Sequence, residues 1–275
     1  MPEATVCLNY GFDAVATWIH AFDSGDNPGR LSRGLYGVDV GLPRILDLHD
    51  RLDLPASFFI PGHTIESFPE AVGEIVDRGH EIQVHGWRHS TWYETPEEER
   101  ADIERAIDAV YDVTGERPTG FRSPAAELSD TTLEILRDLD FRFDSSLQGH
   151  DFEQYYVHEN WSAPRDSTFD RGEPTDIVEI PFDWNLTDFL AFTTIWSDPH
   201  RRGYGDEDVF FRRWYDTFDW MYQNKDNGLF MPITHPQIIG RIPRFVKYEE
   251  FLEYLVDTPD VAFEDMQTIA ADFDG

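Results

Sequence analysis

Four side chains that could act in acid, base or metal chemistry stand at the ends of short apolar runs. Asp13 follows "LNYGF", His85 closes "HEIQVH", Arg122 closes "TGFR" and His235 closes "LFMPITH". If these runs are parallel strands, their carboxyl ends meet at one rim, where barrel folds gather their chemistry. The spacing therefore predicts one site built from distant parts of the chain.

The stretch "HGWRH" is a candidate metal site. His85 and His89 are four residues apart, a spacing at which two imidazoles can reach one ion from a helical turn or a tight loop. Asp13 from a neighbouring strand would supply a third ligand and leave open positions, as in catalytic zinc sites. The alternative is that His85 is a core histidine and His89 a surface one.

The elements that must position these residues alternate between strand and helix. Eight short apolar runs read as strands, and amphipathic patterns between them read as helices. This order predicts a parallel sheet with helical crossovers, either a β/α barrel or an open doubly wound sheet. The expected strands are 5–10, 56–60, 80–85, 119–123, 141–146, 176–182, 229–235 and 261–265, and the expected helices are 41–53, 69–79, 95–115, 129–140, 206–225 and 247–257.

The segments outside these elements are expected to be loops within a single domain, 1–275. Residues 147–176 and 186–205 have few periodic apolar residues and are predicted to be long loops. No linker rich in Gly, Ser or Pro divides the chain, and no repeat is evident. A Gly-rich phosphate fingerprint is also missing after the first strand, which disfavours a nucleotide-binding open sheet.

The charge of the chain is strongly negative. Its 275 residues include 54 acids and 22 bases, giving −32, and only Lys225 and Lys247 are lysines. An acidic coat on a folded domain suits molar salt, where the Debye length falls to about 3 Å, and indicates a halophile. An ordinary acidic mesophilic protein is the alternative. Nucleic acid and anionic membranes are unsuitable partners, because a basic face for phosphate is missing.

The compartment is inferred from cysteine and leader content. Cys7 is the only cysteine, so the chain forms no internal disulfide and no thiolate metal cluster. The N-terminus lacks a basic segment followed by an apolar one, and no run of about 18 apolar residues occurs. We therefore expect a soluble, cytoplasmic protein with no membrane partner.

Together these motifs resemble the polysaccharide deacetylase family, also called the NodB-homology or carbohydrate esterase 4 group. The resemblance is carried by "NYGFDA", "HGWRH", "RSP" at 122–124, "EIPFDW" at 179–184 and "THP" at 234–236, in this order over nearly the whole chain. "DAVATW", "SRGLYGVDVGLPRIL" and "ASFFIPGHTIESF" are similar to a branch with peptidoglycan-deacetylase-like proteins, cyclic imidases and metal-independent allantoinases. The resemblance implies an α/β fold, a distorted (β/α)7-8 TIM-like barrel.

The resemblance also implies roles. Asp13, His85 and His89 match the family's metal ligands, usually for zinc, although cobalt or another divalent ion can serve. Metal-bound water is then the nucleophile, His235 matches the general acid that protonates the leaving amine, and Arg122 matches the arginine that orients the base. The alternative for His235 is a packed histidine before Pro236, and an arginine such as Arg122, taken alone, is more often a structural ion-pair partner. Related barrels often form dimers or tetramers, so a homo-oligomer is possible.

Gly11 departs from the family pattern. Many members carry an Asp two residues before the metal-binding Asp, as the general base, and residues 11 and 13 of a strand face the same side. Three accounts stay open: the metal alone suffices, another carboxylate substitutes, or the protein only binds. Glu127, just past "RSPAA", is the first choice for a substitute base, and a solvated loop acid is its alternative.

The expected activity is hydrolysis of an amide C–N bond in an N-acetylated sugar or a small linear or cyclic amide. Trp87, Pro124 and Trp184 are the predicted substrate-binding residues, and Trp92 and Trp161 also fall near predicted rim loops. Stacking on a sugar or flat ring is the functional reading of these aromatics, and core or lid packing is the alternative. A catalytically silent metal- or ligand-binding protein is the competing hypothesis, favoured by Gly11.

Overall fold

Parallel strands form the centre of the molecule, as the alternating sequence pattern predicts. The computed structural model describes residues 4–196 and 201–274. Its largest sheet has eight strands in the order β12-β2-β3-β4-β5-β6-β8-β7, all pairs being parallel except β7 with β8. These strands are β2 (Asn9–Gly11), β3 (Ser57–Ile60), β4 (Glu81–Val84), β5 (Gly120–Phe121), β6 (Phe143–Asp144), β7 (Tyr155–Glu159), β8 (Glu173–Glu179) and β12 (Ile233–Thr234).

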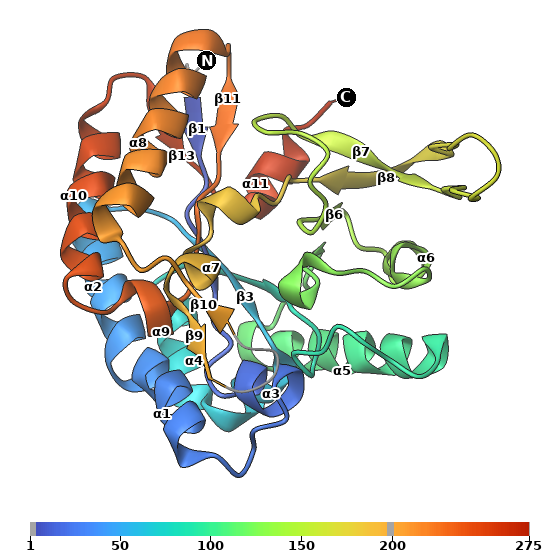
Figure 1. Cartoon of the computed structure of the whole chain (residues 1–275), viewed down its shortest axis with the longest axis horizontal. Helices are drawn as coiled ribbons and strands as arrows, with labels where there is room; N and C mark the ends of the chain where they lie inside the picture. Colours follow the sequence, from blue (N-terminus) through green and yellow to red (C-terminus); the bar gives the residue numbers. More distant parts are fainter. Residues whose placement is uncertain (1–3, 197–200, 275) are drawn as a thin grey trace.

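A second ladder continues the first. β1 (Ala4–Val6) pairs in parallel with β11 (Gly228–Phe230) and β13 (Val261–Phe263). Cys7 and Leu8 join β1 to β2, and Met231 and Pro232 join β11 to β12, so the two ladders share chain segments. A parallel bridge between Thr187 and Ile233 links the segment after β8 back to β12. The result is the irregular, nearly closed arrangement expected of a distorted barrel (Figure 1).

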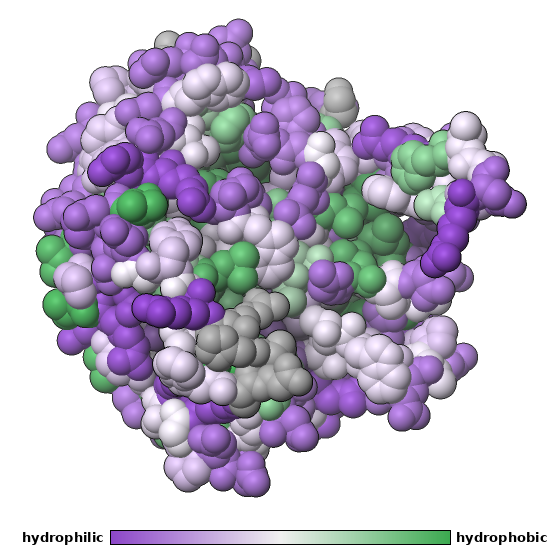
Figure 2. Space-filling model, viewed as in Figure 1, coloured by the Kyte–Doolittle hydropathy of each residue, from purple (hydrophilic) through white to green (hydrophobic). Residues whose placement is uncertain are grey.

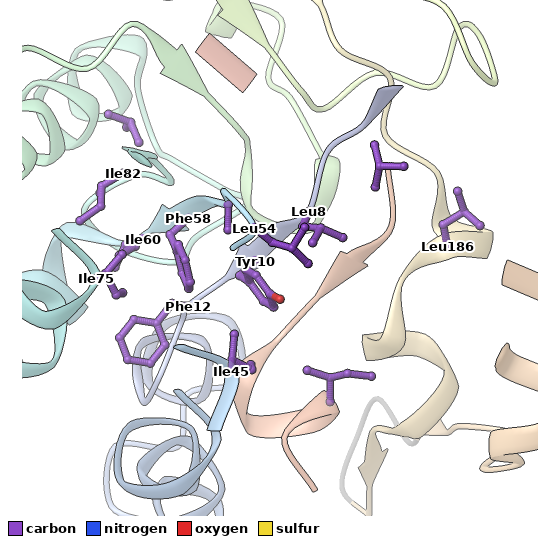
Figure 3. Close-up of a cluster of buried hydrophobic side chains, with 14 of the residues drawn as sticks. Leu8, Tyr10, Phe12, Ile45, Leu54, Phe58, Ile60, Ile75, Ile82 and Leu186 are labelled. Atoms are coloured by element: carbon purple, nitrogen blue, oxygen red, sulfur yellow. The ribbon is translucent and has the colours of Figure 1, made fainter. Parts of the chain in front are cut away.

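Alternate side chains along β2 and its flanking residues point to opposite faces of the sheet. Leu8, Tyr10 and Phe12 point toward the covering helices and pack with residues of β3 and of helix α2 (Leu42–Leu52) (Figure 3). Because alternate residues of a strand face opposite sides, Asn9, Gly11 and Asp13 point to the other face. The sheet therefore buries one apolar face against helices, while its other face carries Asn9, Gly11 and Asp13 beside a second apolar cluster that includes Phe59 and Phe143.

Most of the covering helices coincide with the predicted ones. In α5 (Pro96–Thr114), the side chain of Thr95 accepts a hydrogen bond from the Glu98 amide, and Gly115 ends the helix at a φ of 74°; threonine and glycine are residue types that favour these two cap positions. The helices at predicted positions are α2 (Leu42–Leu52), α4 (Pro69–Asp77), α5 (Pro96–Thr114), α6 (Thr132–Asp138), α8 (Glu207–Asn224) and α10 (Arg244–Asp257).

Other short helices were not anticipated. The π-type turns η1 (Thr17–Ala21) and η2 (Gly37–Gly41) flank α1 (Pro28–Tyr36), and η2 runs without a break into α2, so no turn residue separates the two. The remaining helical segments are α3 (Gly62–Ser67), η3 (Pro124–Ala126), η4 (Trp184–Leu186), α7 (Asp188–Phe192), α9 (Pro236–Ile239) and α11 (Met266–Ala271).

The two predicted long loops are corrected by the structure. Residues 147–176 contain β7, which forms an antiparallel hairpin with β8 at one edge of the sheet (Figure 1). The polar composition of β7 does not predict a strand. Hydrogen bonding to β8 stabilises the strand despite this composition. Residues 186–205 contain α7 and the short pair β9 (Thr194–Ile195) and β10 (Arg201–Arg202), while 197–200 lie outside the described residues.

Hydrophilic side chains cover most of the face seen in Figure 2, in line with the acidic composition. Across the described residues, none of the helices is both long enough and apolar enough to cross a lipid bilayer. Cys7 is buried, as expected for a small core residue in the first strand segment.

Candidate active site

The strand ends bring the predicted residues to one rim. His85 directly follows β4, Arg122 follows β5 and His235 follows β12, while Asp13 comes two residues after β2. β12, β2, β3, β4 and β5 are consecutive parallel neighbours, so their carboxyl ends share one edge. All four residues line a single cavity of about 540 Å³.

Asp13, His85 and His89 form a buried cluster. Oδ1 of Asp13 lies 3.8 Å from Nε2 of His85 and 3.7 Å from Nε2 of His89. These separations are too long for hydrogen bonds, and Oδ1, which is buried, has no hydrogen-bond partner. Two ligand atoms each about 2 Å from one ion are separated by comparable distances. The cluster is therefore of the right composition and size to hold a divalent cation.

The directions in which the pKa values of His85, His89 and Asp13 are shifted favour the binding of a cation. Burial lowers the pKa of His85 to about 3 and also lowers the pKa of His89. Burial alone would raise the pKa of Asp13, but His89, His235 and His85 outweigh it and hold the pKa below its usual value. Nδ1 of His85 lies 2.6 Å from the main-chain oxygen of Arg122 and donates to it. The lone pair of Nε2 then faces Asp13.

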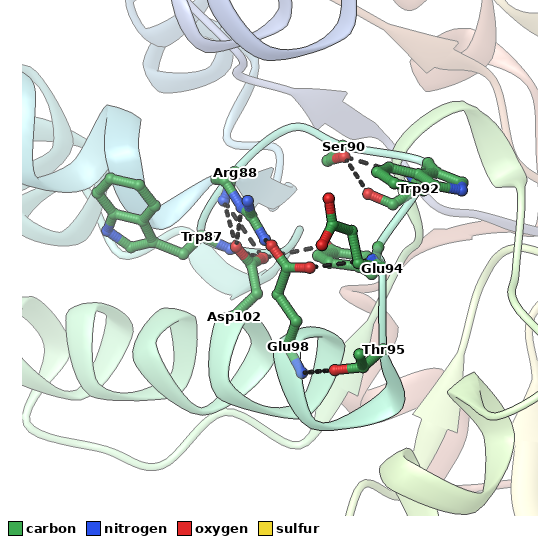
Figure 4. A network of polar contacts seen from close by, with 9 residues as sticks. Trp87, Arg88, Ser90, Trp92, Glu94, Thr95, Glu98 and Asp102 are labelled. Atoms are coloured by element: carbon green, nitrogen blue, oxygen red, sulfur yellow. Dashed lines mark hydrogen bonds and ion pairs between the residues drawn. The ribbon is translucent and has the colours of Figure 1, made fainter.

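Asp102, on α5, fixes the loop that carries both histidines (Figure 4). Its carboxylate accepts hydrogen bonds from the amides of Trp87 (2.8 Å) and Arg88 (3.2 Å) and pairs with Nε of Arg88 at 2.9 Å. Between His85 and Trp87, Gly86 adopts a φ of 68°. Its ideal Cβ would stand 2.8 Å from the Arg88 carbonyl oxygen, so glycine is required at this turn.

His235 faces the cluster from the opposite side. Its Nδ1 donates to Oδ1 of Asp188 at 2.7 Å, its amide donates to Oδ2 at 3.0 Å, and its Nε2 lies 3.9 Å from Oδ2 of Asp13. Burial lowers the pKa of His235, but the charge and hydrogen bond of Asp188 exceed this effect and raise the pKa above its usual value. The pair resembles the oriented acid–base groups of hydrolases.

The His235 ring also covers Gly11. A Cβ on Gly11 would stand 2.8 Å from Cδ2 and 2.9 Å from Nε2 of His235. The position that carries a general base in many family members is thus one at which this chain has room only for glycine, unless His235 moves.

Arg122 is buried below the cluster without contacting an acid. Its Nε donates to the Ser145 carbonyl oxygen (2.9 Å), Nη1 to Oδ1 of Asn9 (2.7 Å) and Nη2 to Oγ of Ser145 (2.8 Å). None of the ion pairs among residues 4–196 and 201–274 involves it. The amide oxygen of Asn9 thus accepts a hydrogen bond from Arg122 that a carboxylate could otherwise accept.

The remaining predicted residues are placed differently. Trp184 lines the cavity and packs edge-on against Phe182, and Glu127 is an exposed residue on the cavity lining. No hydrogen bond or ion pair of the described residues joins the Glu127 carboxylate to Asp13 or the histidines. Pro124 is buried and lies outside the cavity lining, although its neighbours on either side line it.

Three tryptophans lie away from the cavity. Trp87 packs against Arg105, whose guanidinium lies 3.4 Å from the ring centroid, and donates to Glu66 (Figure 4 shows the indole pointing away from the Asp102 network). Trp92 is 69% exposed, and Trp161 pairs with Phe169 in the segment between β7 and β8. Among the four tryptophans considered, only Trp184 lines the cavity.

Strained backbone surrounds the site. Ala14, directly after Asp13, and Ala125 and Ala126, on the cavity wall after Arg122, have φ values of 47°, 55° and 54°. A non-glycine residue in this left-handed region costs about 1–3 kcal/mol and persists where surrounding contacts impose it, often at functional sites.

Sequence reasoning missed Asp188, Asp102, Asn9 and Ser145. Asp188 lies in a segment interpreted as a loop, and the signal for it was the helix start "NLTD", because the Thr187 side chain caps α7. Asp102 is a buried acid on the inner face of a predicted amphipathic helix, which is detectable as a break in the apolar stripe. Asn9 shares the strand face of Gly11, and Ser145 carries no local signal.

The protein is thus of the α/β class, with a buried Asp-His-His cluster at its rim that could hold a metal ion, and comparison with known proteins identifies the family. A sequence model described as "Polysaccharide deacetylase" matches residues 17–143. The peptidoglycan deacetylase of Helicobacter pylori is 34% identical over 282 residues, covering 98% of this chain and 96% of that protein. The chain therefore belongs to the polysaccharide deacetylase family, hydrolases that act on C–N bonds other than peptide bonds.

Solved structures agree with this assignment. A Mycobacterium smegmatis protein assigned to the polysaccharide deacetylases has a TM-score of 0.83 and 26% identity, with 98% of this chain and 90% of that chain covered. The structure of Puue allantoinase has a TM-score of 0.80 and 23% identity with the same coverage, a likeness of fold. Both confirm the expected α/β architecture.

Proposed function

We propose that this protein is a metal-dependent hydrolase of an amide C–N bond, with Asp13, His85 and His89 as the metal ligands. The observation that carries the proposal is the buried Oδ1 of Asp13, which lacks a hydrogen-bond partner and faces the Nε2 atoms of His85 and His89. A buried carboxylate oxygen with no partner is costly unless a cation occupies the space before it. Zinc or another divalent ion such as cobalt suits one carboxylate and two imidazoles.

A divalent ion in this position would lower the pKa of water and stabilise the oxyanion formed from the amide carbonyl. The residues of the chain supply the other functions. Asp188 holds the His235 ring so that Nε2 faces the cluster, and its charge favours the protonated imidazolium. His235 then donates its proton to the leaving nitrogen, which converts a poor amide leaving group into an amine.

The general base is the open part of the mechanism. Gly11 offers no acid, and the loss of a positioned base typically costs about 10²–10⁴-fold in rate. Glu127, on the cavity lining, is the substitute that we propose to test, beside unaided metal. The second candidate function, a catalytically silent binding protein, is favoured by Gly11 alone, whereas the retained His235–Asp188 pair argues for catalysis.

The cavity supports a small substrate. Its volume of about 540 Å³ lies within the range of small-molecule sites, and Phe182, Trp184 and Phe189 give it an aromatic side suited to a sugar or a flat ring. The substrate classes are an N-acetylated sugar or a small linear or cyclic amide. A peptidoglycan fragment is included because of the name of the Helicobacter pylori relative.

The decisive experiment measures metal content and turnover together. The protein, purified in high KCl, is analysed for bound metal, and acetate or amine release from acetamido sugars, imides and ureides is measured with added zinc or cobalt. Asp13→Asn should lose both metal and activity, while Asp26→Asn, an exposed acid, serves as the matched control. Wild-type protein that binds no divalent ion and releases nothing from these substrates would overturn the proposal.

Glu127→Gln separates the accounts of the base. A loss of about 100-fold in kcat with metal affinity unchanged would assign the base to Glu127, whereas an unchanged rate would assign activation of water to the metal alone. Metal binding without turnover in wild-type protein would support the silent alternative.

A further inference from the structure

We propose that Arg122 binds a carboxylate carried by the substrate, so that the amide hydrolysed here is a small anionic compound. This assignment deepens the proposed function and rests on it. Arg122 is only 3% exposed, yet it belongs to the lining of the same cavity as Asp13 and His235. Nδ1 of His85 donates to the main-chain oxygen of Arg122 at 2.6 Å, so the residue adjoins the proposed metal ligands.

Two of the five N–H groups of the Arg122 guanidinium take part in none of its three hydrogen bonds. These three bonds connect it to Asn9 and Ser145. One N–H on each terminal nitrogen is left over. A carboxylate can accept two hydrogen bonds from an arginine at once and carries the opposite charge, so it suits this residue better than a neutral carbonyl does.

All acceptors that contact Arg122 are neutral. Asp144 and Glu179, paired in register on β6 and β8, influence the charge of Arg122 without forming an ion pair with it. Burial raises the pKa of Asp144 to about 6 and also raises the pKa of Glu179, so burial disfavours the charged forms of this carboxyl pair. Burial lowers the pKa of Arg122 to about 10, which leaves a cation whose charge the surroundings only partly compensate.

The other acids in or beside the cavity are not paired with Arg122. Of the two acids on the cavity lining, Asp13 faces the two histidines and Glu127 forms no ion pair with Arg122, while Asp188, beside the cavity, is bound to His235. Residue 11, on the same strand face as Asn9, cannot carry an acid without displacing His235. Within residues 4–196 and 201–274, Arg122 therefore has no contacting counterion, and a substrate that enters the cavity can provide one.

Aromatic rings fix the orientation of the guanidinium. Cζ of Arg122 lies 4.2 Å from the ring centroid of Phe59 and 5.7 Å from that of Phe182. Phe182 also lines the cavity, so the apolar part of a bound substrate would contact the ring that holds the arginine. Such preorganisation lowers the entropy cost of binding.

The binding experiment uses two probes of the same shape. Calorimetric titration of chelator-treated, metal-free protein in fixed KCl compares succinate with succinamide, its neutral analogue. We expect succinate to bind about 10-fold tighter or more, since hydrogen bonds to charged groups are the stronger ones. Arg122→Met and Arg122→Lys should abolish the preference. Equal binding of both probes, or a preference that persists in folded Arg122→Met, would overturn the assignment.

A second measurement needs no variant. The metal-loaded wild-type protein is assayed with N-acetyl-β-alanine and with its neutral amide, and we expect kcat/KM to be at least about 10-fold higher for the acid. Hydrolysis of both at equal rates would overturn the role of Arg122 while leaving the proposed function intact. An Arg122-dependent preference for succinate, with no hydrolysis of any amide, would uphold the binding role and overturn the hydrolase.

Discussion

His235 lies over Gly11 so closely that a Cβ added to Gly11 would stand 2.8 Å from the imidazole Cδ2. The position of the His235 ring therefore depends on the absence of a side chain at Gly11. The absence of a side chain at position 11 removes the family's usual base and also admits the imidazole to the space beside Asp13. This relationship predicts how position 11 responds to substitution.

Gly11→Ala should lower kcat about 10–100-fold, although alanine adds no chemistry, because the new methyl group must push His235 away from its working position. Overpacking should also lower the free energy of unfolding by about 1–3 kcal/mol. Steady-state kinetics and denaturant unfolding test both effects. Gly73→Ala is the matched control, since its Cβ would meet nothing within 4 Å inside helix α4. It should stabilise the helix by about 0.5–1 kcal/mol and leave kcat unchanged.

Gly11→Asp should lower kcat as Gly11→Ala does. Its Cβ displaces His235 in the same way, whether or not the new carboxylate can accept a proton. An increase in kcat above wild type would show that His235 yields easily and that the missing acid limits the rate.

Asp188→Asn should lower kcat about 10²-fold and shift its pH dependence. Asp188 raises the pKa of His235, and a general acid works only while it is protonated. Without the charge of Asp188, His235 loses its proton at a lower pH, so the alkaline limb of the kcat profile should move to lower pH. A profile with an unchanged alkaline limb would show that His235 is not the acid.

Asp13→Asn should remove the response of stability to zinc. In the wild type, the buried Oδ1 of Asp13 has no hydrogen-bond partner and faces the two imidazoles, so it is available to a cation. Adding zinc should raise Tm of the wild type by several degrees and leave Asp13→Asn unchanged, because ligand binding stabilises the folded state. Thermal unfolding of both proteins, with zinc and with chelator, measures this difference in Tm. Equal responses of both proteins to zinc would place the metal elsewhere.

Stability should fall as the pH rises above about 4, in part because of Asp144 and Glu179. Burial raises the pKa of both carboxyls in the folded protein. A raised folded-state pKa contributes stability that is present below the unfolded-state pKa and lost as the pH rises through the folded-state pKa. The loss should therefore extend from about pH 4 through pH 6 for Asp144, and to higher pH for Glu179.

Glu179→Gln should reduce this loss, since glutamine has no proton to release. We expect the difference in unfolding free energy between pH 5 and pH 8 to shrink by about 1 kcal/mol or more. Denaturant unfolding in the same KCl concentration measures it. Glu173→Gln, at the exposed start of the same strand, is the control and should leave the difference unchanged. An equal effect of both variants would contradict the role of the buried pair.

The net charge of −32 predicts that salt stabilises the fold. Raising KCl from about 0.1 M to 1 M shortens the Debye length from about 10 Å to 3 Å and screens the repulsion between surface acids. Tm should rise by at least about 5 °C over this range and level off above it. A Tm that is independent of KCl would contradict the halophilic interpretation of the composition.

The sequence by itself determined the alternating strands and helices, the rim that gathers Asp13, His85, Arg122 and His235, and the family. These features follow from local patterns: a two-residue period in strands, a 3.6-residue period in helices, and the rule that parallel strands end at one edge. The caps of α5 were equally readable, because the hydrogen bonds that make them join residues three or four apart.

Only the tertiary structure decided what each of these residues contacts. Asp188 reaches His235 across 47 positions, Asn9 meets Arg122 across 113, and the His235 ring takes the space above Gly11. Such contacts depend on how strands and loops distant in the sequence pack together, and no local period encodes them. The hairpin of β7 was hidden for the same reason, since its pairing with β8, rather than its own composition, makes it a strand.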